Sequence, residues 1–302
     1  APKKARQFVE RQRISHSGEI DHLLVSTQGQ LVGNQGGSLV LLHPPTKTKA
    51  KRPTRADLRA APSMLLALPK NRILAATKPI KTYDLRSFQA EAGTIKVKEA
   101  PQALAVSKDS KLVAAGGVSL APTVARHKDG EVICTWKSIA NVTWLGLPQV
   151  KDAPWLVAIG NATSGPMGQC ALSGGKVDAR AKEPSWQLCL ETKLDSTIQA
   201  ACVGPSGLIW VARASGDLGL VDPESGRIEA IYSHDPIDAL VPHPDGDWVL
   251  VLTEKALQLV DKKGEVVATV PTGLRPGSPR ALAFTESGEL VVATEDALVL
   301  LE

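Results

Sequence analysis

Short apolar runs alternate with turns along this chain, and residues 237–252, IDALVPHPDGDWVLVL, show the pattern clearly. An apolar run is followed by Pro-Asp-Gly and by a second run rich in Val and Leu. Gly, Asp and Asn supply the backbone angles that tight turns require. Apolar runs of about four to eight residues bounded by such turns are typical of β-strands. Because no long segment shows helical periodicity, we expect an all-β protein built of such hairpins.

The same unit recurs along the chain at a nearly constant spacing. Aligned on the opening of this hairpin, seven segments share a small or apolar residue, a polar residue and an apolar run. The polar positions are separated by 42, 39, 39, 58, 39 and 42 residues. This spacing matches a repeat of about forty residues with one insertion in the fourth unit. The shared polar positions are Asp21, Ser63, Gln102, Asn141, Gln199, Asp238 and Arg280.

Each unit contains up to four predicted strands. A Val- or Ala-rich run follows the first turn, a third run occurs in segments such as DLGLVDPE, and a fourth in segments such as GRIEAIY. Four-stranded units of about forty residues arranged radially are the blades of a β-propeller. We therefore predict one domain over residues 1–302, a seven-bladed β-propeller. Its blades are expected at approximately 15–55, 56–97, 98–137, 138–194, 195–233, 234–273 and 274–302, the last completed by residues 1–14.

The completion of the last blade follows from its missing strand. The seventh unit stops at ALVLLE after three strands, whereas residues 5–14, ARQFVERQRI, alternate apolar and polar positions and precede the first unit. An unpaired strand edge promotes unwanted association. Docking of the N-terminal segment as the fourth strand covers this edge and links the two ends of the chain.

By its period and layout, the chain resembles the WD-repeat and quinoprotein-like β-propeller superfamilies. The resemblance covers essentially the whole chain and is carried by the four-stranded repeat of about forty residues. The dipeptides of true WD repeats do not occur, since no Gly is followed by His and no Trp by Asp. The resemblance implies a propeller fold and, as these folds commonly do, a role as a platform for protein partners.

The shared polar positions are expected to form a ring at one mouth of the central channel, because the first strand of each blade lines that channel. Asp21, Asn141 and Asp238 offer oxygen ligands, and propeller hydrolases that resemble this layout hold Ca²⁺ at such a mouth. Calcium requires about six to eight oxygens, and the charge of Arg280 opposes a cation. We therefore favour a structural use, in which Arg280 bridges Asp238 and Asp21, and we predict neither a metal nor a cofactor.

The histidines provide no catalytic pattern. The adjacent pairs Asp21–His22 and His234–Asp235 point to opposite faces of a strand. No G-x-S-x-G, H-E-x-x-H or phosphate-binding glycine loop occurs, although these are the usual signatures of such sites. We expect solvated histidines at turns and no enzymatic activity. A ligand binder or metal-dependent hydrolase at the channel mouth is the second alternative. The histidines are His16, His22, His43, His127, His234 and His243.

The net charge is only +4, but it is unevenly distributed. Residues 1–15 and 47–59 together hold 11 of the 35 Lys and Arg and only two of the 31 Asp and Glu. In the propeller these segments belong to the outer strands of neighbouring blades, so we expect one basic side patch. Such a patch attracts nucleic acid or an acidic protein, while charge protection of sheet edges explains it equally well. The patch comprises Lys3, Lys4, Arg6, Arg11, Arg13, Lys47, Lys49, Lys51, Arg52, Arg55 and Arg59.

The composition is that of a globular protein, with 43% hydrophobic and 22% charged residues. No apolar run approaches the roughly 18 residues of a membrane span, and four dispersed cysteines favour buried free thiols. We expect an intracellular protein, cytoplasmic or nuclear, with no membrane association; a leader removed earlier stays open as an alternative.

The leading functional hypothesis is a non-catalytic protein–protein interaction module, a scaffold subunit of a larger complex. Loops on rigid scaffolds often carry binding function, and SGGKVDARAKEP, residues 173–184, is predicted to be an inserted loop between the third and fourth strands of blade four. A tolerated hairpin extension explains the same segment. The alternative function is binding of nucleic acid or another polyanion by the basic side patch.

Overall fold

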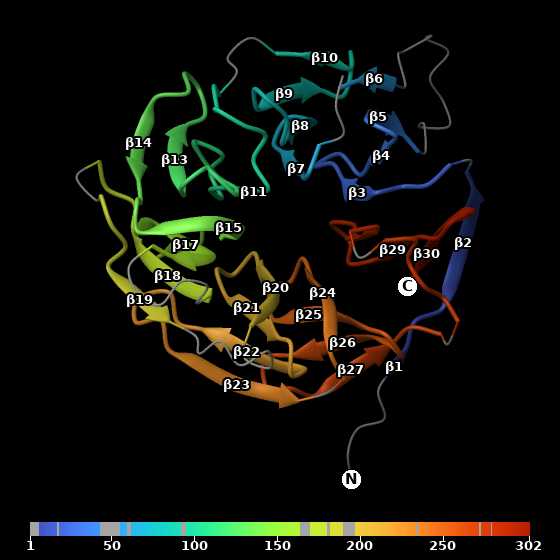
Figure 1. The fold of residues 1–302 in the computed structure, drawn as a ribbon. Helices are drawn as coiled ribbons and strands as arrows, with labels where there is room; N and C mark the ends of the chain where they lie inside the picture. Colours follow the sequence, from blue (N-terminus) through green and yellow to red (C-terminus); the bar gives the residue numbers. More distant parts are fainter. Residues whose placement is uncertain are drawn as a thin grey trace.

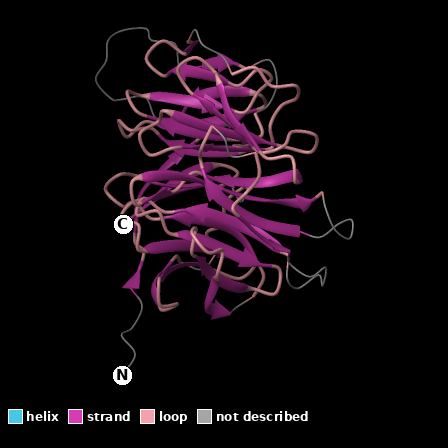
Figure 2. Ribbon diagram, turned by 90° about the vertical axis from the view of Figure 1, so that its left-hand side faces the viewer, coloured by secondary structure: helices cyan, strands magenta, loops and turns pink. Residues whose placement is uncertain are grey.

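The protein is a ring of seven β-sheets around a central channel (Figure 1). The computed structural model describes residues 6–16, 18–42, 55–58, 62–91, 95–163, 170–179, 182–189, 197–233, 235–271, 273–278 and 280–302. Within these ranges all regular elements are strands, and none is a helix with the length and hydrophobicity needed to cross a membrane. Seen from the side, the strands lie between two faces formed by loops (Figure 2). The predicted seven-bladed β-propeller is confirmed.

The first three blades each contain four antiparallel strands in chain order from the channel outwards. Blade one consists of β3 (His22–Val25), β4 (Leu31–Gln35), β5 (Ser38–Leu41) and β6 (Arg55–Asp57). Blade two consists of β7 (Leu65–Leu68), β8 (Arg72–Ala75), β9 (Lys81–Asp84) and β10 (Gln89–Ala90). Blade three consists of β11 (Ala103–Val106), β12 (Leu112–Gly116), β13 (Thr123–Arg126) and β14 (Val132–Thr135).

The remaining blades follow the same order, with additional strands in blades four and six. Blade four consists of β15 (Ile139–Gly146), β16 (Gln149–Val150), β17 (Ala153–Ala162), β18 (Cys170–Lys176) and β19 (Trp186–Cys189). Blade five consists of β20 (Ile198–Val203), β21 (Ile209–Arg213), β22 (Asp217–Val221) and β23 (Ile228–Ser233). Blade six consists of β24 (Ile237–Pro242), β25 (Trp248–Thr253), β26 (Leu257–Asp261), β27 (Val266–Thr269) and β1 (Arg6–Gln7). Blade seven consists of β28 (Leu282–Phe284), β29 (Leu290–Ala293), β30 (Ala297–Leu301) and β2 (Glu10–Ser15).

The N-terminal segment fastens blade seven to blade six. Strand β2 pairs antiparallel with β30 and is the fourth strand of blade seven, as predicted. Strand β1 pairs in parallel with β27 and is a fifth strand of blade six, which the sequence pattern did not indicate. Between the two strands, Phe8 is buried in an apolar cluster contributed by both blades. Its backbone N–H donates a hydrogen bond of 2.9 Å to the carbonyl oxygen of Thr269.

The hydrophobic core lies between neighbouring blades. One cluster joins Trp210 of blade five to Val249 of blade six, and another joins Ile159 of blade four to Val211 of blade five. The second strand of a blade is covered on both faces, so it reads as a nearly continuous apolar run. Strand β25, WVLVLT, is such a run, and five of its six residues are buried. This packing holds the first strands in place around the channel.

Blade four is enlarged differently from our expectation. Residues 173–176 belong to strand β18, so the predicted start of the inserted loop is wrong, whereas residues 177–179 and 182–184 lie between β18 and β19 as predicted. Gly174 lies within this strand, and an aromatic ring packs beside its backbone. A Cβ atom at Gly174 would lie 2.1 Å from the ring of Trp186. The additional length resides partly in the ten-residue strand β17 and in the short strand β16 that pairs with it.

Candidate binding site at the channel mouth

The seven shared polar positions lie where the first strands begin. Asn141, Gln199 and Asp238 lie within β15, β20 and β24, close to their starts. The other four, Asp21, Ser63, Gln102 and Arg280, precede the first strands of their blades by one or two residues. Because the first strands lie side by side around the channel (Figure 1), these positions share one mouth of it.

Blades five and six place the polar residue in a β-bulge. In blade five, Ile198 is opposite Arg213 and Ala200 is opposite Ala212, so Gln199 is the extra residue of the first strand. The same register change makes Asp238 the extra residue of β24 in blade six. A bulge changes the direction of a side chain, and bulges are frequent beside functional sites. The two polar side chains are therefore positioned by the backbone of the mouth.

Blade four has a related irregularity at Asn141, whose φ is 48°. The register between β15 and β17 changes between Ala140 and Trp144. The backbone N–H of Asn141 donates a hydrogen bond of 3.3 Å to the carbonyl oxygen of Val118 in the adjacent turn of blade three. A positive φ at a residue other than glycine is uncommon and persists where the surroundings hold it. No register change separates the first and second strands of blades one, two, three and seven.

Four of the seven polar side chains are exposed and unpartnered. Within the part of the chain that the structure describes, they form no side-chain hydrogen bond and no ion pair. They belong to four consecutive blades, three to six, and we call them the polar arc. The polar arc consists of Gln102, Asn141, Gln199 and Asp238.

The other three positions, on blades seven, one and two, are hydrogen-bonded to neighbouring groups of the protein. The Asp21 carboxylate accepts a hydrogen bond of 3.0 Å from Nδ2 of Asn34, and the Asp21 carbonyl oxygen accepts one of 2.8 Å from the hydroxyl of Ser278. The hydroxyl of Ser63 donates to the carbonyl oxygen of Pro101. This side of the mouth is thus internally satisfied, in contrast to the polar arc.

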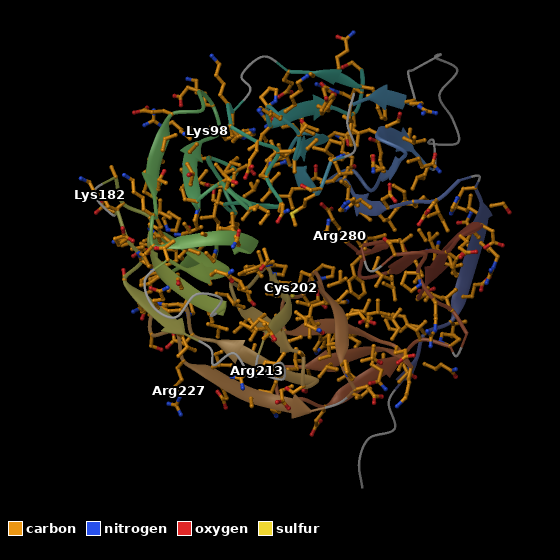
Figure 3. The ribbon with its side chains drawn as sticks, in the orientation of Figure 1. Lys98, Lys182, Cys202, Arg213, Arg227 and Arg280 are labelled. Atoms are coloured by element: carbon orange, nitrogen blue, oxygen red, sulfur yellow. The ribbon has the colours of Figure 1, made fainter. Side chains whose placement is uncertain are left out.

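Arg280 is the third of these hydrogen-bonded positions. Its Nη1 donates a hydrogen bond to the carbonyl oxygen of Ser63 and lies 3.3 Å from Nε2 of His22. Figure 3 shows Arg280 at the inner side of the ring. Among the described residues, Arg280 forms no ion pair with Asp21 or Asp238, so the expected bridge between these carboxylates is wrong. Aligning the repeats of the chain indicates equivalent positions for these three residues, but it does not indicate which groups their side chains contact.

Burial and the neighbouring guanidinium lower the pKa of His22 to about 4. Desolvation is the largest cause and the positive charge of Arg280 the next, while a hydrogen bond with the Ser63 backbone acts in the opposite direction. Because arginine can only donate, Nε2 of His22 accepts and its proton resides on Nδ1. The imidazole is therefore neutral and part of the junction between three blades.

The other described histidines, His16, His127 and His243, also differ from the expected solvated turn residues. Both ring nitrogens of His16 are buried. His243 is buried between the rings of Trp248 and Phe284, with centroids 4.9 and 4.8 Å away, and burial lowers its pKa. His127 lies 3.0 Å from the hydroxyl of Thr82 and 3.1 Å from the carbonyl oxygen of Ser110. The expectation was wrong because packing between blades, rather than the adjacent turn residues, determines their surroundings. His43 and His234 lie outside the described residues.

The structure describes part of the basic side patch. Strands β2 and β6 are the outer strands of neighbouring blades. Arg11 forms an ion pair with Glu289, Arg13 with Glu10 at 2.8 Å, and Nη2 of Arg55 donates to the hydroxyl of Ser38 at 2.9 Å. For Arg6 only the strand is described. Lys3, Lys4, Lys47, Lys49, Lys51, Arg52 and Arg59 lie outside the described residues, so the merged patch stays a prediction.

No protein-family model matches this chain, and no match is found among curated proteins. Within the described ranges, no three His, Cys, Asp or Glu side chains form a group that could hold a metal ion. The chemistry that the mouth offers is hydrogen bonding by three amides and one carboxylate of the polar arc.

Replacing Arg280 by Ala is expected to lower the free energy of unfolding by about 1 kcal/mol, because it removes a charged hydrogen bond that joins two blades. Thermal unfolding measures this effect. Arg227→Ala is the matched control, since Arg227 is exposed on the outer side of blade five (Figure 3) and its side chain bonds to no described residue. Equal melting temperatures for the Arg280 variant and the wild type would contradict this junction role.

Proposed function

We propose that the protein is a non-catalytic binding module, a scaffold subunit that holds a protein partner at the polar arc. The observation that carries this proposal is the contrast within one ring of equivalent positions. On blades seven, one and two the polar groups are hydrogen-bonded to other groups of the protein, whereas on blades three to six the side chains are exposed and bond to no described residue. Polar groups held by rigid backbone and left free are available to a ligand.

The rigidity of the mouth favours binding. Association costs less when the contacting groups are already ordered, and two residues of the polar arc are extra residues of bulges inside paired strands. Their flanking residues Ile198 and Ile237 are buried. The side chains therefore project from fixed points, and a partner need not order a loop in order to use them.

Amide side chains suit a protein partner. Each Asn or Gln offers two N–H donors and one carbonyl acceptor, the same groups that a peptide backbone presents. The alternative, attraction of nucleic acid by the basic side patch, has less support from the described part, because Arg11 and Arg13 are paired with carboxylates.

The test is affinity capture from the native source with three forms of the protein. The arc variant carries Gln102→Ala, Gln199→Ala and Asp238→Ala. The control variant carries Gln28→Ala and Asp152→Ala, two exposed residues in turns at the opposite ends of first-to-second strand hairpins. We expect one set of proteins to be retained by the wild type and the control and depleted at least about tenfold by the arc variant, equal folding being checked by thermal unfolding.

Retention of the same proteins by the arc variant would contradict the proposal. If retention instead falls steeply with salt and is lost on Lys49→Glu, Lys51→Glu, Arg52→Glu and Arg55→Glu, the polyanion-binding alternative replaces it, because counterion release makes such binding strongly salt-dependent.

A further inference from the structure

We infer that the partner enters the polar arc as an extended segment with a basic side chain that pairs with Asp238. This inference rests on the proposed function and names the chemistry of the partner. Three observations support it: the position of Asp238, the pairing of the neighbouring charged side chains with other residues, and the order of the side chains along the arc.

Asp238 is a carboxylate at the mouth that no described cation neutralises. Asp235, three residues earlier, forms an ion pair of 3.0 Å with Nζ of Lys255. Asp21 is bound by Asn34. The cation of the ring, Arg280, is engaged by Ser63 and lies against His22. The charge of Asp238 is therefore left for a ligand.

The bulge keeps this carboxylate at the surface. Ile237 is buried and paired opposite Thr253, and Ala239 is paired opposite Leu252. Asp238 lies between these two anchored residues and is exposed. Its position cannot shift along the strand without breaking the pairs on both sides, so the negative charge is presented in a fixed place. Fixed charges recognise a partner with little reorganisation.

The rest of the arc indicates an extended peptide rather than a single ion. Gln199, Asn141 and Gln102 follow Asp238 on the next three blades around the mouth. Each amide can pair with one peptide group through a donor and an acceptor. Beside Asn141, the side chain of Val118 is 52% exposed, and its carbonyl oxygen accepts the Asn141 N–H. The arc thus has a carboxylate at its blade-six end, and an exposed apolar side chain lies beside Asn141 toward its blade-three end.

This order of groups also discriminates against a polyanion. Phosphate groups would meet the unpaired charge of Asp238, and like charges brought together at an interface oppose binding. A segment with a Lys or Arg opposite Asp238 and an apolar residue toward Val118 matches both ends of the arc.

The experiment uses random seven-residue peptides displayed on phage and selected against the immobilised full-length protein. The selected peptides are synthesised, and their dissociation constants are measured by calorimetry. We expect enriched sequences to contain Lys or Arg, and Asp238→Asn to weaken their binding at least tenfold. Asp152→Asn, an exposed aspartate at the opposite end of blade four, should leave binding unchanged. Replacing the basic residue of the peptide by an uncharged one should weaken wild-type binding but add little in the Asp238→Asn protein, as expected for directly coupled groups.

Each outcome separates this inference from the proposed function. Peptides that are lost on Gln199→Ala but bind Asp238→Asn normally would overturn the basic pairing and leave the binding role standing. Failure to enrich any peptide would overturn the extended-segment inference, while the capture experiment with the arc variant decides the binding role by itself. Peptides that bind every variant equally, together with unchanged capture by the arc variant, would overturn both.

Discussion

Replacing Phe8 by Ala is expected to lower the free energy of unfolding by about 3 kcal/mol, the usual cost of truncating a buried phenylalanine. Phe8 is only 8% exposed and contacts a cluster drawn from blades six and seven. It also lies between β1 and β2, so its side chain anchors the short strand on one blade and the closing strand on the other. Chemical denaturation followed by tryptophan fluorescence measures the change.

The next residue provides the control. Val9 is 66% exposed, and its backbone exchanges two hydrogen bonds of 3.0 Å with Glu302. Val9→Ala keeps those bonds and removes little buried surface, so a change within about 0.5 kcal/mol is expected, as for most surface substitutions. A similar loss of stability in both variants would show that Phe8 does not act as the anchor between the blades.

The repeat made the fold predictable because its signals are local. Apolar runs and turn residues recur within each unit of about forty residues, and their order alone implies radial stacking. The seventh unit lacks a fourth strand, and because an exposed strand edge has to be covered, the N-terminal strand β2 could be predicted to dock there. Strand β1 was not predictable in this way, since the two residues Arg6 and Gln7 are too few to show an alternation.

The start of the inserted loop in blade four could not be predicted from the sequence. Gly174 and Gly175 fell within the expected loop, although both belong to β18. The reason is tertiary: the ring of Trp186 occupies the space beside Gly174, and the same ring lies within 2.5 Å of a Cβ built at Gly226 of blade five. Such close approaches of an aromatic ring to backbone are not encoded in the glycine's own neighbours.

Aligning the repeats predicted seven equivalent polar positions, which lie at or just before the starts of the first strands, but it could not predict which of them bond to other described residues. This bonding depends on side chains distant in sequence, such as Asn34 beside Asp21 and Arg280 beside Ser63. One local signal for the bulges was nevertheless present. Proline precedes Ser63, Gln102 and Arg280, and a residue without an N–H cannot extend the strand pairing backwards.

Blades five and six have Ile in place of that proline, at Ile198 and Ile237. Both isoleucines pair with the second strand, and the following polar residue becomes the extra residue of the bulge. Blade one shows that Ile alone does not produce the bulge, because Ile20 precedes Asp21 and yet β3 begins at His22 with a continuous register.

The burial of the histidines could not be predicted from the sequence. A single His beside a turn has no periodic pattern, and burial of His22 depends on the close approach of Arg280 and Ser63 from two other blades.

The burial of His22 makes the stability of the protein depend on pH. The pKa of His22 is lowered from 6.5 to about 4 in the folded protein, so the unfolded chain binds a proton first as the pH falls. The folded state therefore loses stability between about pH 6.5 and about pH 4 and then levels off with respect to this group.

We expect His22 alone to remove about 3 kcal/mol of stability over that interval, since each unit of pKa difference corresponds to about 1.4 kcal/mol. His243 acts in the same direction, because burial lowers its pKa as well.

Denaturation midpoints measured in steps from pH 7 to pH 4 should fall for the wild type. The His22→Gln variant should lose less stability over this interval, by roughly the stated amount. Phe8→Ala, which lowers the stability without altering a titratable group, should keep the wild-type slope although its stability is lower at every pH. If His22→Gln follows the same slope as the wild type, the imidazole is not held neutral beside Arg280, and the junction of blades seven, one and two must be stabilised in another way.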